Sequence, residues 1–158
     1  MHGKRCNITA PTVPVNDGLQ CGYNSHARIA EVKFQLNSAE AGVNVVRAYA
    51  PGEVTINRQV YRDSLVLTRD RIITDCLPER FDELASSHFE ALRALAPELV
   101  IFGSGRRLRF PPLSLTQPLV NAQVGLEVMD TGAACRTYNI LVGEGRHVVA
   151  ALLMIESA

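Results

Sequence analysis

The sequence predicts an α/β fold with a mainly parallel central sheet, helices on both of its faces, and an antiparallel β-hairpin region in the N-terminal half. Two observations lead to this fold class. Apolar and polar residues alternate between Val45 and Leu67, which is typical of half-buried antiparallel strands joined by tight turns. After Phe81, helical apolar stripes alternate with short apolar runs, as in a parallel sheet whose strands are connected by helices.

The N-terminal half is expected to supply short strands separated by turn residues. We place these strands at residues 33–36, 45–49, 53–56, 60–67 and 71–74. Pro51-Gly52 and the segment Asn57-Arg58-Gln59 interrupt the alternation, and both are typical of tight turns.

Three helices are expected in the C-terminal half. The first carries an apolar stripe between Phe81 and Ala96 and ends before a proline. The second begins at a capping box formed by Ser114 and Gln117, runs to residue 124 and is ended by Gly125. The third covers residues 132–141, is capped by the residue at 130 or 131, and is stopped by glycines at 143 and 145.

Strands are expected between these helices. The apolar runs at residues 99–102 and 126–129 predict two parallel strands, because a helix joins them. The last and most apolar strand covers residues 147–155, and we expect it to lie at the centre of the sheet.

Composition and length point to one globular domain. Residues 32–158 are expected to form it, whereas residues 1–31 lack any apolar period and are predicted to be a disordered tail or to precede the true start of the protein. The formal net charge is zero, which argues against nucleic acid as a partner. No signal peptide or membrane-spanning run is visible, so we expect a cytoplasmic protein.

The cysteines predict neither a metal site nor a disulfide framework. Cys6, Cys21, Cys76 and Cys135 are far apart and form no CxxC pair, whereas structural zinc sites use closely spaced ligands. We therefore expect reduced thiols, no bound metal and no cofactor.

Several segments resemble a small α/β domain family. They are LVIFGSG (residues 99–105), the pair Pro111-Pro112, and GLEVMDTGAACRTYNILVGEGRHVVAALL (residues 125–153), with further likeness at 33–36 and 60–65. The family includes the mitochondrial complex I (NADH dehydrogenase) assembly factor 3, and its bacterial and archaeal members are single-domain proteins of unknown activity. The resemblance implies a three-layer α/β/α sandwich with a mixed, mostly parallel sheet, and it implies no established reaction.

A candidate site lies at the predicted carboxyl ends of the parallel strands, where ligands bind in open α/β sheets. Gly103, Ser104 and Gly105 follow a buried strand, and Arg106 comes next, so the loop is a candidate for binding a small anion. The alternative is a tight turn followed by a solvated basic loop, because the motif lacks the further residues of a dinucleotide or P-loop fingerprint.

The third helix supplies the other candidates. Asp130 is a possible base or ligand but is better explained as a helix cap, and Thr131 lies beside it. Cys135 is a possible nucleophile near the helix start, although no partner base is evident and a buried free cysteine is common. Arg136, Thr137, Tyr138 and Asn139 form a polar cluster that either lines a cleft or hydrogen-bonds to neighbouring backbone.

Two functions from different classes follow. The first is a non-enzymatic binding or assembly-factor-like protein with an unidentified protein partner, since no catalytic set is complete and no catalytic residue is assigned. The second is an enzyme or small-anion binder that uses the Gly103–Gly105 loop and a cleft over residues 130–139. The loop and the third helix are expected to meet at one edge of the sheet.

Overall fold

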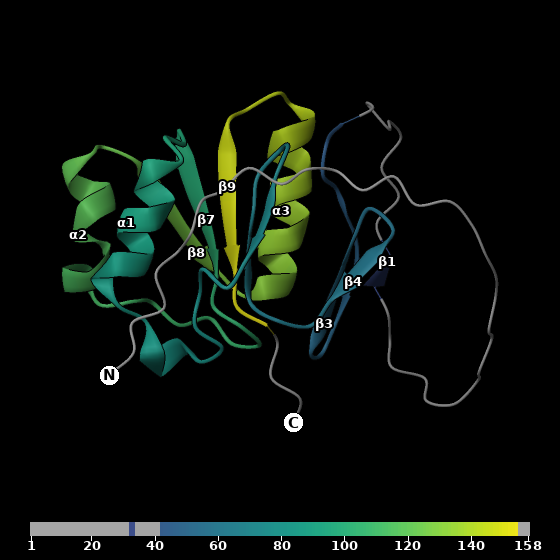
Figure 1. The fold of residues 1–158 in the computed structure, drawn as a ribbon, viewed down its shortest axis with the longest axis horizontal. Helices are drawn as coiled ribbons and strands as arrows, with labels where there is room; N and C mark the ends of the chain where they lie inside the picture. Colours follow the sequence, from purple (N-terminus) through teal and green to yellow (C-terminus); the bar gives the residue numbers. More distant parts are fainter. Residues whose placement is uncertain (1–31, 34–41, 155–158) are drawn as a thin grey trace.

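The computed structural model describes residues 32–33 and 42–154, and these form two β-sheets and three α-helices. The expectations for residues 1–31, and for residues 34–36 of the first strand, lie outside the described residues. The mixed α/β class predicted from the sequence is confirmed (Figure 1).

The larger sheet has the strand order β6-β5-β9-β7-β8. Its members are β5 (Leu65–Leu67), β6 (Ile72–Thr74), β7 (Leu99–Gly103), β8 (Gly125–Met129) and β9 (Val148–Leu152). β7 pairs in parallel with both β8 and β9, whereas β5 pairs antiparallel with β9 and β6. Four strands therefore run in one direction and only β5 opposes them, so the sheet is mixed and mostly parallel.

The smaller sheet is antiparallel throughout. It contains β1 (Val32–Lys33), β2 (Val46–Ala50), β3 (Glu53–Ile56) and β4 (Gln59–Tyr61), in chain order. Gly52 and Asn57 have positive φ angles of 77° and 55° in the two hairpin turns, a conformation that glycine and asparagine adopt more easily than other residues. The two turns predicted from the sequence are confirmed.

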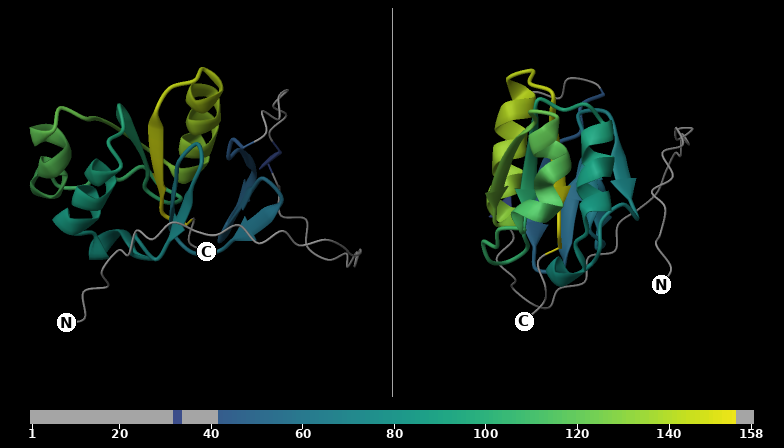
Figure 2. Two further views of the ribbon diagram at one scale, coloured as in Figure 1. Left: turned by 45° about the horizontal axis from the view of Figure 1, so that its top comes forward. Right: turned by 90° about the vertical axis from the view of Figure 1, so that its left-hand side faces the viewer.

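The helices cover both faces of the larger sheet (Figures 1 and 2). α1 (Ser86–Ala94) and α2 (Leu113–Asn121) lie side by side on one face, and α3 (Thr131–Gly143) lies on the other. The smaller sheet lies beside α3 on that same face, because Val46 and Ile56 pack in one apolar cluster with Cys135 and Tyr138.

The central place of the last strand is confirmed. β9 lies between β5 and β7, and all five of its residues are buried. The strand ends at Leu152, so it is shorter than the predicted range of 147–155. Its position explains why this segment has the most apolar composition in the sequence.

The prediction of one strand over residues 60–67 is wrong. The chain leaves the smaller sheet after Tyr61 and enters the larger one at Leu65, so β4 and β5 belong to different sheets. The residues of β4 are exposed or half-buried, whereas those of β5 are buried on both faces. Ser64 contributes to the break, since its hydroxyl accepts the backbone N–H of Met154.

The boundaries of two helices also differ from the predictions. Phe81–Glu83 forms a separate 3₁₀ turn, and α1 starts only at Ser86, where the Nδ1 atom of His88 accepts the Ala85 N–H at 2.9 Å. In α2, Ser114 lies within the helix and forms no capping box, because the helix begins directly after Pro112.

The end of α2 is likewise earlier than expected. The helix stops at Asn121, and Gln123, with a φ of 56°, turns the chain before Gly125. The N–H of Val124 then donates to the carbonyl of Leu119, which is a common way to terminate a helix.

Candidate functional site

The structure brings the Gly103–Gly105 loop and the start of α3 into direct contact. The N–H of Gly105 donates to the hydroxyl of Thr131, and the N–H of Thr131 donates to the carbonyl of Gly105, each at 2.9 Å. A Cβ atom at Gly103 would lie 3.0 Å from the Cα of Thr131, so this close approach favours glycine. The convergence expected from the strand topology is present for the start of α3, whereas Asn139 contacts β2 instead. A binding role for the loop stays a prediction.

The hydroxyl of Ser104 is fully used within the loop. The side chain is buried, its Oγ donates to the carbonyl of Arg107 at 2.8 Å, and the carbonyl of Met129 lies 3.0 Å away. The same oxygen accepts the N–H of Arg109 at 3.0 Å. Since buried polar groups are stable when they are hydrogen-bonded, Ser104 has a clear structural role that holds the loop closed.

Asp130 and Thr131 stabilise the start of α3. The Oδ1 of Asp130 accepts the N–H of Ala133 at 2.8 Å, which is an N-cap. The hydroxyl of Thr131 donates to the carbonyl of Leu153 at 2.6 Å, so this residue joins the ends of β7, β9 and α3. The capping explanation preferred from the sequence for Asp130 is therefore confirmed.

The arginines after the loop have different environments. Arg106 is exposed, whereas Arg109 is half-buried. The guanidinium of Arg109 lies 4.4 Å from the centroid of the Phe81 ring, and it donates to the carbonyl of Ser104 at 3.2 Å. Its Nε atom is buried without a hydrogen-bond partner among the described residues. This donor is the feature of the loop that most resembles part of an anion site.

Asn139 faces the smaller sheet, not the loop. It is 3% exposed, its amide nitrogen donates to the carbonyl of Val46 at 2.7 Å, and its amide oxygen accepts the Val46 N–H at 2.9 Å. It lies eight residues after Thr131, about 12 Å along the helix axis. Asn139 thus satisfies backbone groups of β2 at the point where the β2–β3 register shifts.

The remaining residues of the polar cluster also lie between α3 and the smaller sheet or on the helix surface. The hydroxyl of Tyr138 donates to the carbonyl of Asn44 at 3.1 Å, and Thr137 is half-buried. The guanidinium of Arg136 donates to the hydroxyl of Tyr49 at 2.6 Å. Backbone and sheet contacts thus account for most of the cluster.

Cys135 lies wholly inside the core. Its side chain belongs to the cluster between α3 and the two sheets, and burial raises the pKa of its thiol to about 12. A nucleophilic cysteine requires an accessible thiolate, which this environment disfavours. The structure therefore supports the buried, inert alternative for Cys135.

This environment makes a test straightforward. In the folded protein at pH 8, iodoacetamide is expected to leave Cys135 unmodified, because its thiolate fraction is roughly 1000-fold below that of an ordinary thiol and the side chain is buried. Peptide mapping by mass spectrometry after timed labelling would measure this, with protein unfolded in urea as the control. Equal labelling rates in the two states would show that Cys135 is accessible.

The pH dependence of stability has a defined sign at this residue. The folded-state pKa of Cys135 lies above the ordinary value of 9.0. The preference for the neutral thiol therefore contributes fully below pH of about 9 and is lost as the pH rises toward 12.

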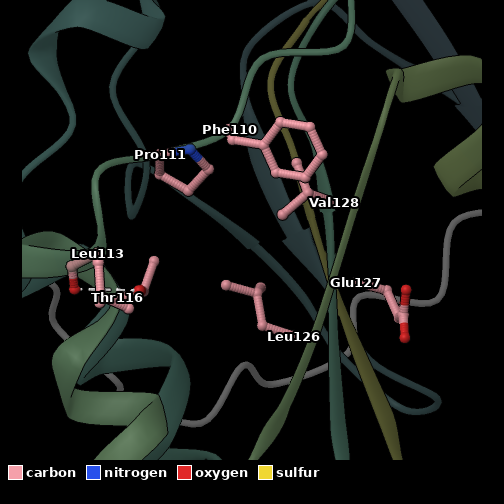
Figure 3. A pocket seen from close by; sticks show the side chains of 7 residues that line it. All are labelled: Phe110, Pro111, Leu113, Thr116, Leu126, Glu127 and Val128. Atoms are coloured by element: carbon pink, nitrogen blue, oxygen red, sulfur yellow. Dashed lines mark hydrogen bonds between the residues drawn. The ribbon is translucent and has the colours of Figure 1, made fainter.

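A surface feature that the sequence analysis did not single out lies next to β8. Phe110 and Leu113 are each 70% exposed, and Leu108 is 54% exposed. Phe110 and Leu113 line a pocket of about 410 Å³, which Figure 3 shows between the 110–113 segment, α2 and β8. We call this pocket and its rim the β8 groove, lined by Phe110, Pro111, Leu113, Thr116, Leu126, Glu127 and Val128.

The sequence does contain a signal for this surface. In the segment LRFPPL (residues 108–113), large apolar residues stand next to two prolines. Because proline is poorly tolerated inside a helix or a strand, this segment is predicted to stay in a loop. The proline pair entered the sequence analysis only as part of the family resemblance. Leu108, Phe110 and Leu113 are exposed although Pro111 is buried, and the helix begins at Leu113, directly after Pro112.

Metal binding finds no support in the described part of the chain. No group of three or more His, Cys, Asp or Glu side chains lies close enough there to hold a metal ion.

Comparison with known proteins places the chain in a family. Residues 46–153 match the family described as a protein of unknown function (DUF498/DUF598). The chain belongs to this family. The matched range includes the Gly103–Gly105 loop, α3 and the whole β8 groove.

Two bacterial proteins are similar to this chain over most of their length. An uncharacterised protein of Rhodobacter capsulatus is 36% identical over 121 residues, which cover 75% of this chain and 90% of that protein. A protein of Francisella tularensis subsp. holarctica named "13 kDa major membrane protein" is 29% identical over 105 residues, covering 65% of this chain and 84% of that protein. None of the helices in the described part of this chain has the length and apolarity that a bilayer crossing requires.

Solved structures share the fold. A Bordetella parapertussis protein matches with a TM-score of 0.68 and 34% identity, over 73% of this chain and 99% of that one. A Bordetella pertussis protein described as a Mth938-like domain matches with a TM-score of 0.67 and 28% identity, over 80% of this chain and 95% of that one. The match covers nearly the whole of both solved chains, and their descriptions state no activity.

Proposed function

We propose that this chain is a non-enzymatic binding module that presents the β8 groove to a partner protein. The carrying observation is the exposure of Phe110 and Leu113 beside a pocket whose walls are mainly apolar. Contiguous exposed apolar surface on a small domain favours a docking role, and an aromatic side chain beside a pocket is a common energetic centre of interfaces.

The hydrogen-bonding of the candidate loop supports the same function. The hydroxyls of Ser104 and Thr131 both have protein partners, and Cys135 is buried. An enzyme needs a reactive group that can reach a substrate. The groove, by contrast, offers surface that has no partner in the described part of the chain.

The resemblance to the mitochondrial complex I assembly factor 3 agrees with such a role. An assembly factor acts by holding other proteins, and a groove with an exposed aromatic rim is suited to that task. We therefore assign the assembly-factor-like function to the β8 groove and leave the identity of the partner to experiment.

The test compares two surface variants by affinity capture from cells of the protein's own organism. Phe110→Ser combined with Leu113→Ser removes the apolar rim, and Ile140→Ser, at a residue 58% exposed on α3, is the matched control. The amount of a specific partner captured is expected to fall at least 30-fold with the double variant, equivalent to about 2 kcal/mol of binding free energy. The control variant is expected to capture as much partner as the natural protein. A partner that both variants retain equally would show that the groove is not the docking surface.

Small-anion binding is a second candidate, favoured by the buried, unpartnered Nε of Arg109 next to Ser104. Native mass spectrometry of the same preparations distinguishes the two functions. A retained anionic ligand that is lost on Arg109→Gln and kept in the groove double variant would favour the anion site.

A further inference from the structure

β8 is the edge strand of the larger sheet, and in the part of the chain described by the structure it pairs only with β7. The N–H of Gly125 donates to the carbonyl of Glu98, and the carbonyl of Met129 accepts the N–H of Ser104. The backbone groups at both ends of β8 therefore point toward β7. Since these groups alternate in direction along a strand, those of Leu126 and Val128 point outward from the sheet.

The side chains of the same two residues line the groove. Figure 3 shows Leu126 and Val128 on the side of Phe110 and Pro111, whereas Glu127 projects to the other side of the strand. A chain laid along β8 would thus find unpaired backbone donors and acceptors at the edge. Every second side chain of that chain would face the groove.

We propose that the partner docks as an extended strand added antiparallel to β8, with apolar side chains opposite Leu126 and Val128 and a basic side chain opposite Glu127. This inference rests on the proposed function and specifies its mode. Antiparallel pairing is chosen because its hydrogen bonds are slightly more stable than those of parallel pairing. Glu127 is exposed, so its carboxylate is available to a cross-strand cation.

The charge of Glu127 argues against a second copy of this chain as the occupant. A two-fold antiparallel pairing that uses all outward groups would set Leu126 opposite Val128 of the copy. Glu127 would then lie directly opposite Glu127 of the copy, and directly opposed like charges destabilise a strand pair. A charge in the middle of an exposed edge strand is a common protection against self-association.

A synthetic peptide tests the pairing directly. The probe is acetylated and amidated Thr-Val-Lys-Val-Thr, whose valines face Leu126 and Val128 and whose lysine faces Glu127. With peptide at millimolar concentration, amide hydrogen exchange measured by NMR is expected to slow at least 10-fold at Leu126 and Val128. The amides of Gly125 and Glu127 already point toward β7, so their exchange is expected to stay unchanged.

N-methylated peptides provide a matched control within the probe. The valine N–H groups face β8 in the antiparallel arrangement, whereas the lysine N–H faces away. N-methylation of either valine is expected to weaken binding at least 10-fold, and N-methylation of the lysine is expected to leave it nearly unchanged. Equal affinities of the two kinds of peptide would overturn strand addition.

Charge reversal tests the residue opposite Glu127. Glu127→Lys is expected to weaken binding of the lysine peptide roughly 5-fold and to strengthen binding of the peptide Thr-Val-Glu-Val-Thr by a similar factor. Glu144→Lys changes the net charge equally at an exposed site after α3 and is expected to change neither affinity. Identical effects of the two variants would show that no cation lies opposite Glu127.

Three further results would overturn strand addition without deciding whether the β8 groove binds a protein. Peptide-dependent shifts at Phe110 and Leu113 without slower exchange at Leu126 and Val128 would mean that the groove binds in another mode. Slower exchange that depends on protein concentration without peptide would identify a second copy as the occupant. No shift at any residue would exclude this strand pattern, while the capture experiment with the rim variants still decides whether the groove binds a protein.

Discussion

Replacement of Leu152 by alanine is expected to lower the free energy of unfolding by about 2–5 kcal/mol. Leu152 is fully buried in β9, the middle strand of the larger sheet, where it pairs with Leu65 on one side and Gly103 on the other. It packs in the cluster that joins α3 to both sheets, so a shortened side chain leaves a cavity that several elements would have to fill together. The loss of transfer free energy and the cavity both act in the same direction.

Urea denaturation of the full chain measures this effect. A lower midpoint with an unchanged slope is expected, because the surface exposed on unfolding stays nearly the same. Val60→Ala is the control, since Val60 is 43% exposed on β4, and its effect is expected within about 0.5 kcal/mol. A loss below about 1 kcal/mol for Leu152→Ala would contradict the close packing around β9.

Asn139→Ala is expected to have a similarly large effect, about 2–4 kcal/mol, for a different reason. The substitution leaves both the N–H and the carbonyl of Val46 without their partner in a buried place. Each unsatisfied backbone group costs about 1–3 kcal/mol, and the space left by the amide reduces that cost where water can enter. Ile140→Ala, on the exposed side of α3, is the control.

Asn139→Asp adds a pH-dependent test of the same contact. A protonated aspartic acid can donate to the carbonyl of Val46, whereas an ionised one is a buried charge without a cation, so burial raises its pKa. Its folded-state pKa therefore exceeds the unfolded value, and stability is lost as the pH rises through that range. Urea denaturation of the variant and the natural protein at each pH measures this effect. The free energy of unfolding that the variant loses relative to the natural protein is expected to be larger at neutral pH than near pH 4.

These two variants also decide how Asn139 contributes to function. A stability loss with unchanged partner capture by the folded fraction would show a structural role between α3 and β2. A stable Asn139→Ala protein that no longer retains a ligand would instead support the cleft that sequence reasoning placed over residues 130–139.

Patterns local in the chain were enough to predict most of the architecture. The pattern of apolar residues in a strand reflects how many of its faces are buried. This is seen in the alternation around Val54 and Ile56, in the apolar run at residues 99–102 and in the apolar C-terminal strand. The Asp130 cap of α3 is also local, because the carboxylate bonds to an N–H three residues later. Such features need no knowledge of distant residues.

Other features depend on contacts between distant residues. The alternating pattern of residues 60–67 does not reveal the change of sheet, since a period of two is the same in either sheet. The amide of Asn139 meets Val46, 93 residues earlier, and the same polar residue on a helix would line a cleft if β2 lay elsewhere. Its role follows from strand placement, which residue types alone do not specify.

The exposed edge at β8 shows the same division. Composition indicates a strand at residues 126–129, with a charged residue in its middle, but it does not state how many neighbours that strand has. The sheet order leaves β8 outermost, and Phe110 and Pro111 line the same groove as Leu126 and Val128. Local sequence determines which segments become strands, because buried positions are apolar and exposed positions are polar. Which strands pair with each other, and which strand lies at the edge of a sheet, depends on packing contacts between residues that are far apart in the chain.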